Sequence, residues 1–317
     1  MRRDIRRGIT LVELLVVVSL AGIMVALLLP AVYSAQTAAR QASCTQNLRQ
    51  VGLALFNYES VNDVLPMSQV RGAGRGNGHS VFTAILPYIE QASLYNGYNF
   101  DLENYAVDNQ TVVRSRVSTF LCPENPDVEN FDARDVRFPD SRSSFAKAHY
   151  GANWGGGRGF RGEAGSGYRR TPPQGDSRGP WGDDFAKACG TYLGVMMTVI
   201  TPDGRTKGAD GRPKARNVRL RDITDGASFT LAIVEKRDSF GWAVGGWGGS
   251  EFDVHTAPAY NGDDALARKV YSGSNHSEGP NALMCDGSVR QLEGKQDRTL
   301  WYALITRAGG EAVKFEN

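Results

Sequence analysis

Residues 9–32 form one long apolar run in which only Thr10, Glu13 and Ser19 are polar. As a helix rising about 1.5 Å per residue, this run spans about 36 Å, more than the roughly 30 Å hydrocarbon core of a bilayer. A cleaved secretory signal has a shorter apolar region followed by a small-x-small site. The pattern therefore predicts a transmembrane helix over residues 9–32.

The apolar pattern changes but continues after the predicted membrane segment. Five residues spaced 4, 3, 4 and 3 apart give a stripe on one face of a helix: Cys44, Leu48, Val51, Leu55 and Tyr58. Pro66 and the Gly-rich stretch 71–79 end this pattern. We therefore expect the helix to continue over residues 33–62 and to carry a globular head, residues 63–317, on its apolar face.

In the first half of the head, the spacing of apolar residues predicts a helix over residues 79–100 and then a strand over residues 112–123. Residues 151–180 contain many glycines, which predicts a long surface loop, a surface excursion that is not part of the core. A further strand is expected over 191–200, closed by a turn.

The second half predicts more strands and a last helix. Residues 218–238 read as a short strand, a turn at Asp225-Gly226 and a second strand from Leu231 to Glu235, whose end we expect to be solvated. Asp286-Gly287 between short alternating runs is a hairpin signal that calls for positive φ at both residues. Asp297 is expected to cap a final helix. The fold class is α+β, with a long helix packed on a mixed, mainly antiparallel head.

Charge gives the orientation of the membrane helix. Four arginines precede it (Arg2, Arg3, Arg6 and Arg7), whereas Arg40 is the first basic residue after it, so the amino terminus should be cytoplasmic. The formal net charge of the whole chain is +2, and the first eight residues alone contribute +3, so the remaining residues have a net charge of −1. This balance removes the main support for a nucleic-acid partner. With 41% apolar and 22% charged residues, the chain has the composition of a folded protein.

Glu13 is costly inside a membrane unless it meets a cation or reaches the headgroups. Together with the basic leader, Gly8 and Ile9, the segment RRGITLVELLVVVSLAGIMVALLLPAV resembles the type IV prepilin signature. The resemblance implies cleavage after Gly8 by a prepilin peptidase, methylation of the Ile9 amine, and assembly in which Glu13 pairs with a neighbouring subunit's amine. Ile9 departs from the Phe that is commonest there. A pilin-like fold follows from the same resemblance.

Several body segments are similar, in order, to a large family of bacterial prepilin-like proteins related to the major pseudopilins of type II secretion. They include QNLRQVGLALFNYES, VSTFLCP and NHSEGPNALMCDGSVRQLE. The family's carboxyl end has a His, nine residues and Asp-Gly, which His276, Asp286 and Gly287 match. Family positions also imply that Cys44 pairs with Cys122, and that Cys189 pairs with Cys285.

Candidate metal and catalytic groups are few. His276, Glu278 and Asp286 supply too few ligands for calcium or zinc, so we expect His276 to fix its loop onto the hairpin by hydrogen bonds and no metal to bind. His79, His149 and His255 lack nearby ligands in the sequence. The Gly-rich stretches lack the Gly-Lys-Ser/Thr ending of phosphate loops, so no cofactor and no enzymatic activity are expected.

The expected function is a structural subunit of a type IV pilus or type II secretion pseudopilus. It would be anchored in the inner membrane, with a periplasmic head, and its partners would be the prepilin peptidase and like or related pilin subunits. The alternative is a membrane-tethered binding module that does not polymerise and recognises a glycan, ion or protein. Four tryptophans near glycines could line a carbohydrate surface, although packing is the stronger expectation: Trp154, Trp181, Trp242 and Trp247.

Overall fold

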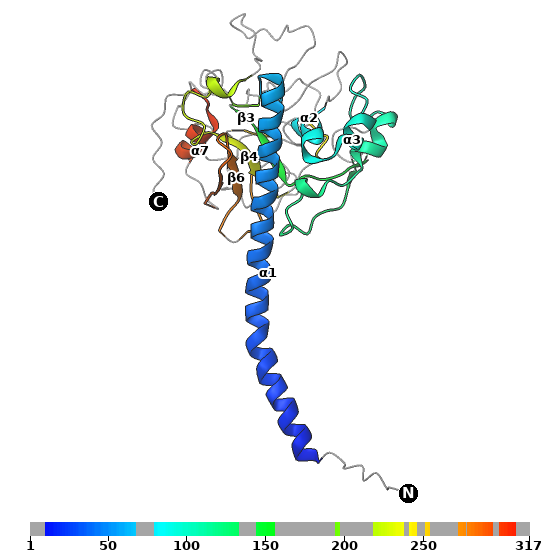
Figure 1. Cartoon of the computed structure of the whole chain (residues 1–317), viewed down its shortest axis with the longest axis vertical. Coiled ribbons are helices and arrows are strands. Elements are labelled where there is room, and N and C mark those ends of the chain that lie inside the picture. Colours follow the sequence, from blue (N-terminus) through cyan, green and yellow to red (C-terminus); the bar gives the residue numbers. More distant parts are fainter. Residues whose placement is uncertain are drawn as a thin grey trace, which may run out of the picture.

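The computed structural model describes residues 10–67, 79–132, 144–155, 194–196, 218–237, 241–245, 251–253, 272–276, 278–293 and 298–308. Helix α1 (Leu11–Asn62) is a long rod, and the head packs against only its carboxyl-terminal part (Figure 1). At about 1.5 Å per residue, its 52 residues extend about 78 Å. The expectations at Cys189, Asp297, Trp181, Trp247 and His255 lie outside the described residues.

Helix α1 begins and ends with local hydrogen bonds. The Thr10 hydroxyl oxygen accepts the Glu13 N–H at 3.3 Å, and the Glu13 carboxylate accepts the Thr10 N–H at 2.8 Å, which makes a capping box. At the other end Asp63 takes a left-handed conformation, φ 57°, and donates its N–H to the Glu59 carbonyl. Pro30 lies inside the helix without ending it. The capping box fixes the start of the helix at Leu11, and Ile9, where the apolar run begins, lies outside the described residues.

One face of the carboxyl-terminal half of α1 is buried, as the apolar stripe predicts. Cys44, Leu48 and Val51 are fully inaccessible, Leu55 is nearly so, and Tyr58 packs edge-on against Tyr88 with ring centroids 6.1 Å apart. The other buried members of this face are Gly52 and Ala54. The prediction of an amphipathic continuation is confirmed.

The head is built on a five-stranded sheet in the order β5-β3-β4-β6-β7. Its strands are β3 (Tyr150–Gly155), β4 (Leu231–Glu235), β5 (Glu251–Asp253), β6 (Asn281–Met284) and β7 (Val289–Gln291). Only the β3–β5 pair is parallel, while β3–β4, β4–β6 and β6–β7 are antiparallel. The α+β class and the mixed, mainly antiparallel sheet are confirmed.

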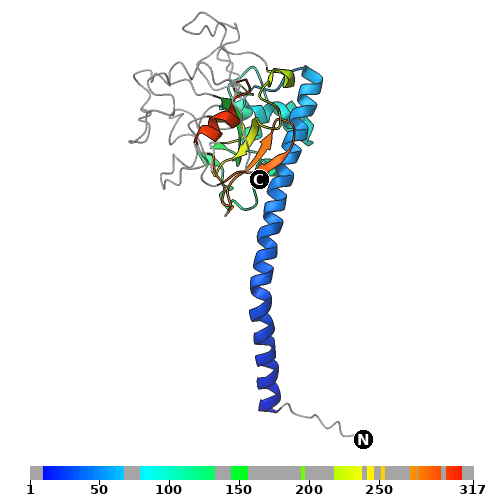
Figure 2. The ribbon, with the colours of Figure 1, turned by 90° about the vertical axis from the view of Figure 1, so that its left-hand side faces the viewer.

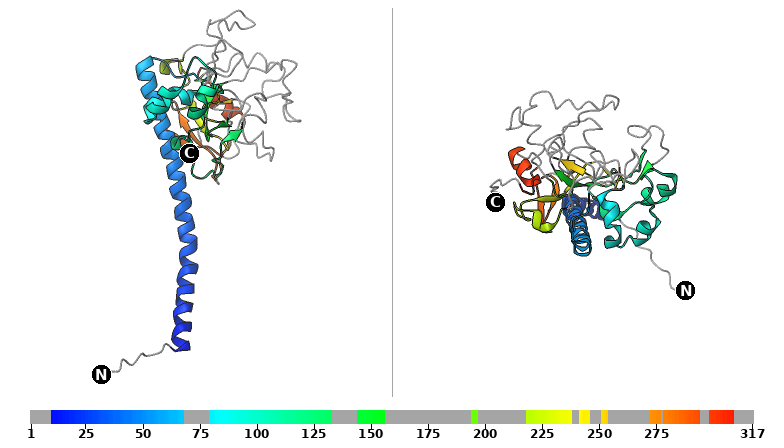
Figure 3. Two further views of the ribbon diagram at one scale, coloured as in Figure 1. Left: turned by 90° about the vertical axis from the view of Figure 1, so that its right-hand side faces the viewer. Right: turned by 90° about the horizontal axis from the view of Figure 1, so that it is seen from above.

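The sheet separates two apolar layers. Helix α1 covers one face and α7 (Arg298–Ile305) covers the other, which Figures 2 and 3 show from the side and from above. Along β6, Leu283 points to the α1 layer, whereas Ala282 and Met284 belong to the α7 layer. This alternation is the two-residue period of a strand, so β6 is buried on both faces.

Short helices and one small hairpin complete the described head. They are α2 (Val81–Ile85), η1 (Leu86–Ile89), α3 (Ala92–Gly97), η2 (Val107–Asn109), α4 (Gln110–Val113), η3 (Ser118–Phe120), η6 (Leu220–Asp222), and the strand pair β1 (Phe131–Asp132) and β2 (Ser144–Phe145). The expected helix over 79–100 is thus divided into three pieces. Pro87 falls in η1, where a proline near the start of a helical turn is tolerated.

Three predictions about local structure are wrong. Residues 112–123 form α4 and η3 instead of a strand, because their apolar positions also fit helical turns that bury Val113 and Phe120. Residues near 218 form the 3₁₀ turn η6 instead of a strand. Residues 151–155 belong to β3, an interior strand of the sheet, and not to a surface excursion, and Ala152 and Asn153 are fully buried there. Of the expected strand over 191–200, only 194–196 are described, and they are not in a strand.

The β6–β7 turn differs in detail from the expected one. Among the described residues Gly287 has a positive φ, 86°, and Asp286 does not, so the two-residue turn with both residues left-handed is wrong. Asp286 instead accepts the N–H and the hydroxyl of Ser288 on its carboxylate, at 2.8 and 2.6 Å. A Cβ on Gly287 would lie 2.8 Å from a Phe56 ring carbon. Glycine is therefore required both by the backbone and by the approach of α1.

Candidate functional site

The amino-terminal part of α1 is one candidate site. Every described residue from Thr10 to Gln36 is exposed, so this half of the helix has no contact with the head. It is long and apolar enough to span a membrane. The Ser19 hydroxyl donates to backbone carbonyls of its own helix, at 2.9 Å, which satisfies that polar group without water. Gly8 and Ile9 lie outside the described residues.

Glu13 faces the first turn of its own helix. Its carboxylate accepts both the backbone N–H and the hydroxyl of Thr10, each at 2.8 Å. Thr10 therefore holds the charge at the helix amino terminus, where the helix dipole also favours an anion. The carboxylate is exposed and free to meet a further cation there.

A second candidate site lies where α1 meets the head. Cys44 of α1 and Cys122, which follows η3, form a disulfide, the pairing that the family resemblance implies. Both cysteines are buried. The Asn47 side chain of α1 donates to the Leu121 carbonyl at 2.8 Å beside this bridge. We call the buried set of Cys44, Cys122, Glu235 and His276 the junction cluster.

Glu235 and His276 complete the junction cluster. The expectation that Glu235 is a solvated strand end is wrong, because its side chain is only 2% exposed. The carboxylate accepts the backbone N–H of Asn281 at 2.7 Å and its side-chain amide at 3.1 Å. His276 Nε2 lies 3.5 Å from Glu235 Oε1 and 3.5 Å from Cys122 Sγ. The β4–β6 pairing thus brings a buried acid and an imidazole against the disulfide.

The electrostatics of the junction cluster favour a protonated imidazole. The hydrogen bond to Glu235 raises the pKa of His276, and the charges of Glu235 and Glu124 add to this effect, while desolvation opposes it. Tyr150, on β3, is also buried nearby, and desolvation together with the Glu235 charge raises the pKa of its phenol. The cluster is therefore a small, charged region inside an apolar interface.

His149 has a structural role next to the same loop. Its Nδ1 accepts the backbone N–H of Cys122 at 3.0 Å, and its Nε2 lies 2.8 Å from the Asp127 carbonyl. An accepting Nδ1 and a donating Nε2 describe the neutral imidazole. His79 instead packs edge-on against Phe100, and desolvation lowers the pKa of His79. Neither histidine belongs to the junction cluster.

The carboxyl-terminal residues of the proposed signature do not meet at one point. His276 is in the junction cluster, whereas Asp286 and Glu278 are exposed, with Asp286 bound to Ser288 in the hairpin turn. The sequence led us to expect that His276 fixes its loop onto the hairpin, but its side chain lies against Glu235 of β4 and Cys122. The residue that the sequence reasoning missed as its partner is Glu235, and the available signal was one acidic residue ending the apolar run LAIVE.

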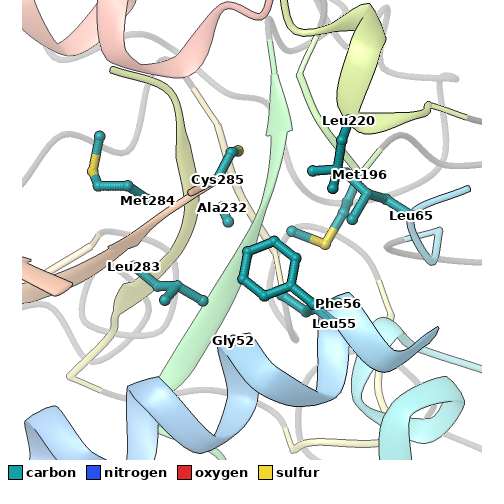
Figure 4. A pocket seen from close by; sticks show the side chains of 10 residues that line it. All are labelled: Gly52, Leu55, Phe56, Leu65, Met196, Leu220, Ala232, Leu283, Met284 and Cys285. Carbon is teal, nitrogen blue, oxygen red and sulfur yellow. The ribbon is translucent and has the colours of Figure 1, made fainter. Parts of the chain in front are cut away.

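Cys285 follows β6 and carries a buried free thiol, instead of the expected bridge to Cys189. It lines a small apolar cavity between α1 and the sheet, together with Gly52, Phe56 and Leu283 (Figure 4). Desolvation raises the pKa of the Cys285 thiol well above its usual range. The cavity, about 10 Å³, is at the lower limit for one water molecule and is too small for a ligand.

Of the four tryptophans, Trp242 has a described side chain. It is fully buried, packs on Phe120 with centroids 6.1 Å apart, and donates its indole N–H to the Ser115 carbonyl at 3.0 Å. Trp242 therefore contributes to the core and not to a carbohydrate-binding surface.

Comparison with known proteins yields two matches. The family described as "Protein of unknown function (DUF1559)" matches residues 33–299, and the prokaryotic N-terminal methylation motif matches residues 3–29. No curated protein and no solved structure matches the chain. The first match covers the carboxyl-terminal half of α1 and nearly the whole head, and the second covers residues before α1 and most of its exposed amino-terminal part.

Proposed function

Because the chain belongs to the DUF1559 family and carries the prokaryotic N-terminal methylation motif, we propose that it is a structural subunit of a type IV pilus or type II secretion pseudopilus. The prepilin-type motif implies processing by a prepilin peptidase and assembly with pilin subunits. A pilin-like family favours a structural protein over an enzyme. The finer assignment rests on the shape of α1 and on Glu13.

The observation that carries this proposal is the division of α1 into two halves. The amino-terminal half is apolar and exposed, whereas the other half holds the head through its buried face. Apolar surface of this extent is stable only in lipid or against other helices. We assign residues 1–8 to a cytoplasmic leader, 9–32 to the inner membrane, 33–62 to the periplasmic continuation and 63–317 to a periplasmic head.

In this proposal the peptidase cuts after Gly8, and the new amine of Ile9 is methylated. Glu13 of one subunit then pairs with that amine on a neighbour, which offsets the cost of burying both charges among helices. Thr10 already holds the Glu13 carboxylate at the helix start, so the acceptor is oriented before the neighbour arrives. The pair would set the stagger between adjacent helices.

The test compares Glu13→Gln with Glu59→Gln in cells that express the chain. Both changes remove one carboxylate from α1, but Glu59 lies beside the head. We expect Glu13→Gln to remove the protein from sheared filaments or from cross-linked membrane assemblies while its membrane level stays unchanged, and Glu59→Gln to assemble normally. Mass spectrometry of the mature amino terminus should find methylated Ile9 in the parent. Normal assembly of Glu13→Gln would instead favour a tethered, non-polymerising module.

A further inference from the structure

The junction cluster contains four potential metal ligands on four separate segments. They are Cys44 on α1, Cys122 after η3, Glu235 at the end of β4 and His276 before β6. One ligand atom from each lies within 4.8 Å of all the others. In the oxidised chain the two sulfurs are bonded to each other, so they cannot act as thiolate ligands.

The spacing of these atoms matches a tetrahedral zinc ion. With zinc–sulfur distances of about 2.3 Å and zinc–nitrogen or zinc–oxygen distances of about 2.1 Å, tetrahedral angles place S and N about 3.6 Å apart, and N and O about 3.4 Å apart. The corresponding distances from His276 Nε2 are 3.5 Å to Cys122 Sγ and 3.5 Å to Glu235 Oε1. Two of the ligand-to-ligand distances are therefore already those of a bound ion.

The remaining change is at the sulfurs. Two thiolates on one zinc ion lie about 3.8 Å apart, and reduction of the disulfide leaves each cysteine free to rotate about its Cα–Cβ bond. The Cα atoms of Cys44 and Cys122 are 5.0 Å apart, so the sulfurs can separate without moving α1 away from the head.

The neighbours of the cluster hold the other ligands in place. Asn281 fixes the Glu235 carboxylate with two hydrogen bonds, while Asn47 and His149 bind the carbonyl and the N–H of the Leu121–Cys122 peptide. Outer contacts of this kind orient the ligands of protein metal sites. A buried carboxylate beside a buried imidazole is costly as a mere packing element, but it is suited to a cation.

We propose that the dithiol form of this protein binds one zinc ion through Cys44, Cys122, Glu235 and His276, in the place that the disulfide takes in the oxidised form. Two thiolates, one imidazole and one carboxylate suit zinc better than calcium or magnesium, which prefer oxygen ligands. This inference is independent of the pilus assignment, because it concerns only how α1 is fastened to the head.

The zinc-bound dithiol form and the disulfide form interconvert by metal binding and thiol–disulfide exchange. On binding, the two thiols give two protons to solvent and a protonated His276 gives a third, so that its Nε2 and the ionised carboxylate of Glu235 donate lone pairs to the metal. On oxidation, an external disulfide accepts two electrons and its sulfur–sulfur bond breaks to give two thiolates. The Cys44–Cys122 bond forms and the zinc ion is released. Either form joins α1 to the head, so the head is fastened to α1 before the two cysteines are oxidised.

The test uses the full chain in detergent with Cys189→Ser and Cys285→Ser, so that only the two junction thiols remain. After reduction with a phosphine under argon, Co²⁺ is added and then displaced by Zn²⁺. We expect one Co²⁺ per chain with thiolate-to-cobalt charge-transfer absorption and the d–d bands of tetrahedral cobalt. Oxidation by glutathione disulfide should release the ion, which a chromogenic zinc chelator quantifies.

Ligand variants separate this site from adventitious thiol binding. Glu235→Gln keeps the side-chain volume and an oxygen for Asn281, and His276→Ala removes the nitrogen ligand. Each should weaken Zn²⁺ binding by at least about tenfold, while His79→Gln, a histidine outside the cluster, should leave it unchanged. The oxidised form of the same Cys189→Ser/Cys285→Ser chain should bind no ion. Absence of a tetrahedral spectrum, equal binding by this oxidised form, or unchanged affinity in both ligand variants would overturn the proposal.

Discussion

Removal of the Cys44–Cys122 disulfide should destabilise the head by an amount that follows from the chain it encloses. The two cysteines are 78 residues apart in sequence. The loop-closure relation gives an entropy of about −15 cal/mol/K for a loop of that length, which corresponds to about 4.5 kcal/mol at 25 °C. A domain is usually stable by about 5–15 kcal/mol, so this loss is a large part of the total.

The assay is guanidinium unfolding of the full chain in a mild detergent, followed by tryptophan fluorescence, because Trp242 and Trp301 are buried in the head. We compare the oxidised parent with Cys44→Ala/Cys122→Ala, both with a metal chelator present. The double variant should unfold at lower denaturant, with a free energy of unfolding lower by about 3–5 kcal/mol. The reduced parent should resemble the double variant, since it too lacks the cross-link.

Cys285→Ala provides the matched control, since it removes a buried sulfur that is not in a disulfide. It should cost only about 1 kcal/mol, from lost packing. A loss below about 1 kcal/mol in the double variant, or an equal loss in Cys285→Ala, would show that the cross-link does not constrain the unfolded chain as reasoned.

Three further predictions concern the same interface and sheet. The raised pKa of His276 means that its ion pair with Glu235 stabilises the fold fully below the unfolded-state pKa of about 6.5, and that this stability is lost as pH rises through the folded-state pKa. Gly52→Val should cost about 1–3 kcal/mol, because its Cβ would lie 2.9 Å from Leu283 Cδ1. Asn153→Ala should cost about 2 kcal/mol, because its amide donates to two buried carbonyls at 2.7 and 2.9 Å. Denaturant midpoints check all three predictions. For His276 the midpoints are measured between pH 5.5 and about 8.5, a range around the usual histidine pKa.

Each of these changes has a control elsewhere in the chain. His276→Gln should flatten the pH dependence, while His79→Gln should not. Gly22→Val lies on the exposed half of α1 with no heavy atom within 4 Å of its Cβ, and should leave the midpoint unchanged. Asn57→Ala changes an exposed asparagine and should also be neutral. A midpoint that is insensitive to pH, or to Gly52→Val or Asn153→Ala, would contradict the corresponding contact.

The local elements show where sequence patterns suffice. The α1 stripe and the strand Leu231–Glu235 were predicted correctly because both have strong periodicity or continuous apolar character. The prediction of a strand over residues 112–123 was wrong because a short apolar run fits a strand and helical turns equally well. Contacts with the rest of the head decide between the two. The prediction of a surface loop over residues 151–155 was wrong because glycine and alanine are typical of loops. Small residues are also needed in a crowded interior strand such as β3.

The sequence by itself determined the long apolar helix, the match of Gly8, Ile9 and Glu13 to the N-terminal methylation motif, and the amphipathic continuation, since these depend on local composition and on a 3.6-residue period. The junction cluster was decided by the tertiary structure alone. Its members lie up to 232 residues apart in sequence, from Cys44 to His276, and no local pattern encodes that meeting. The pairing of β4 with β6 and the packing of α1 on the sheet bring them together, because burying apolar surface leaves only this arrangement for the polar groups between the layers.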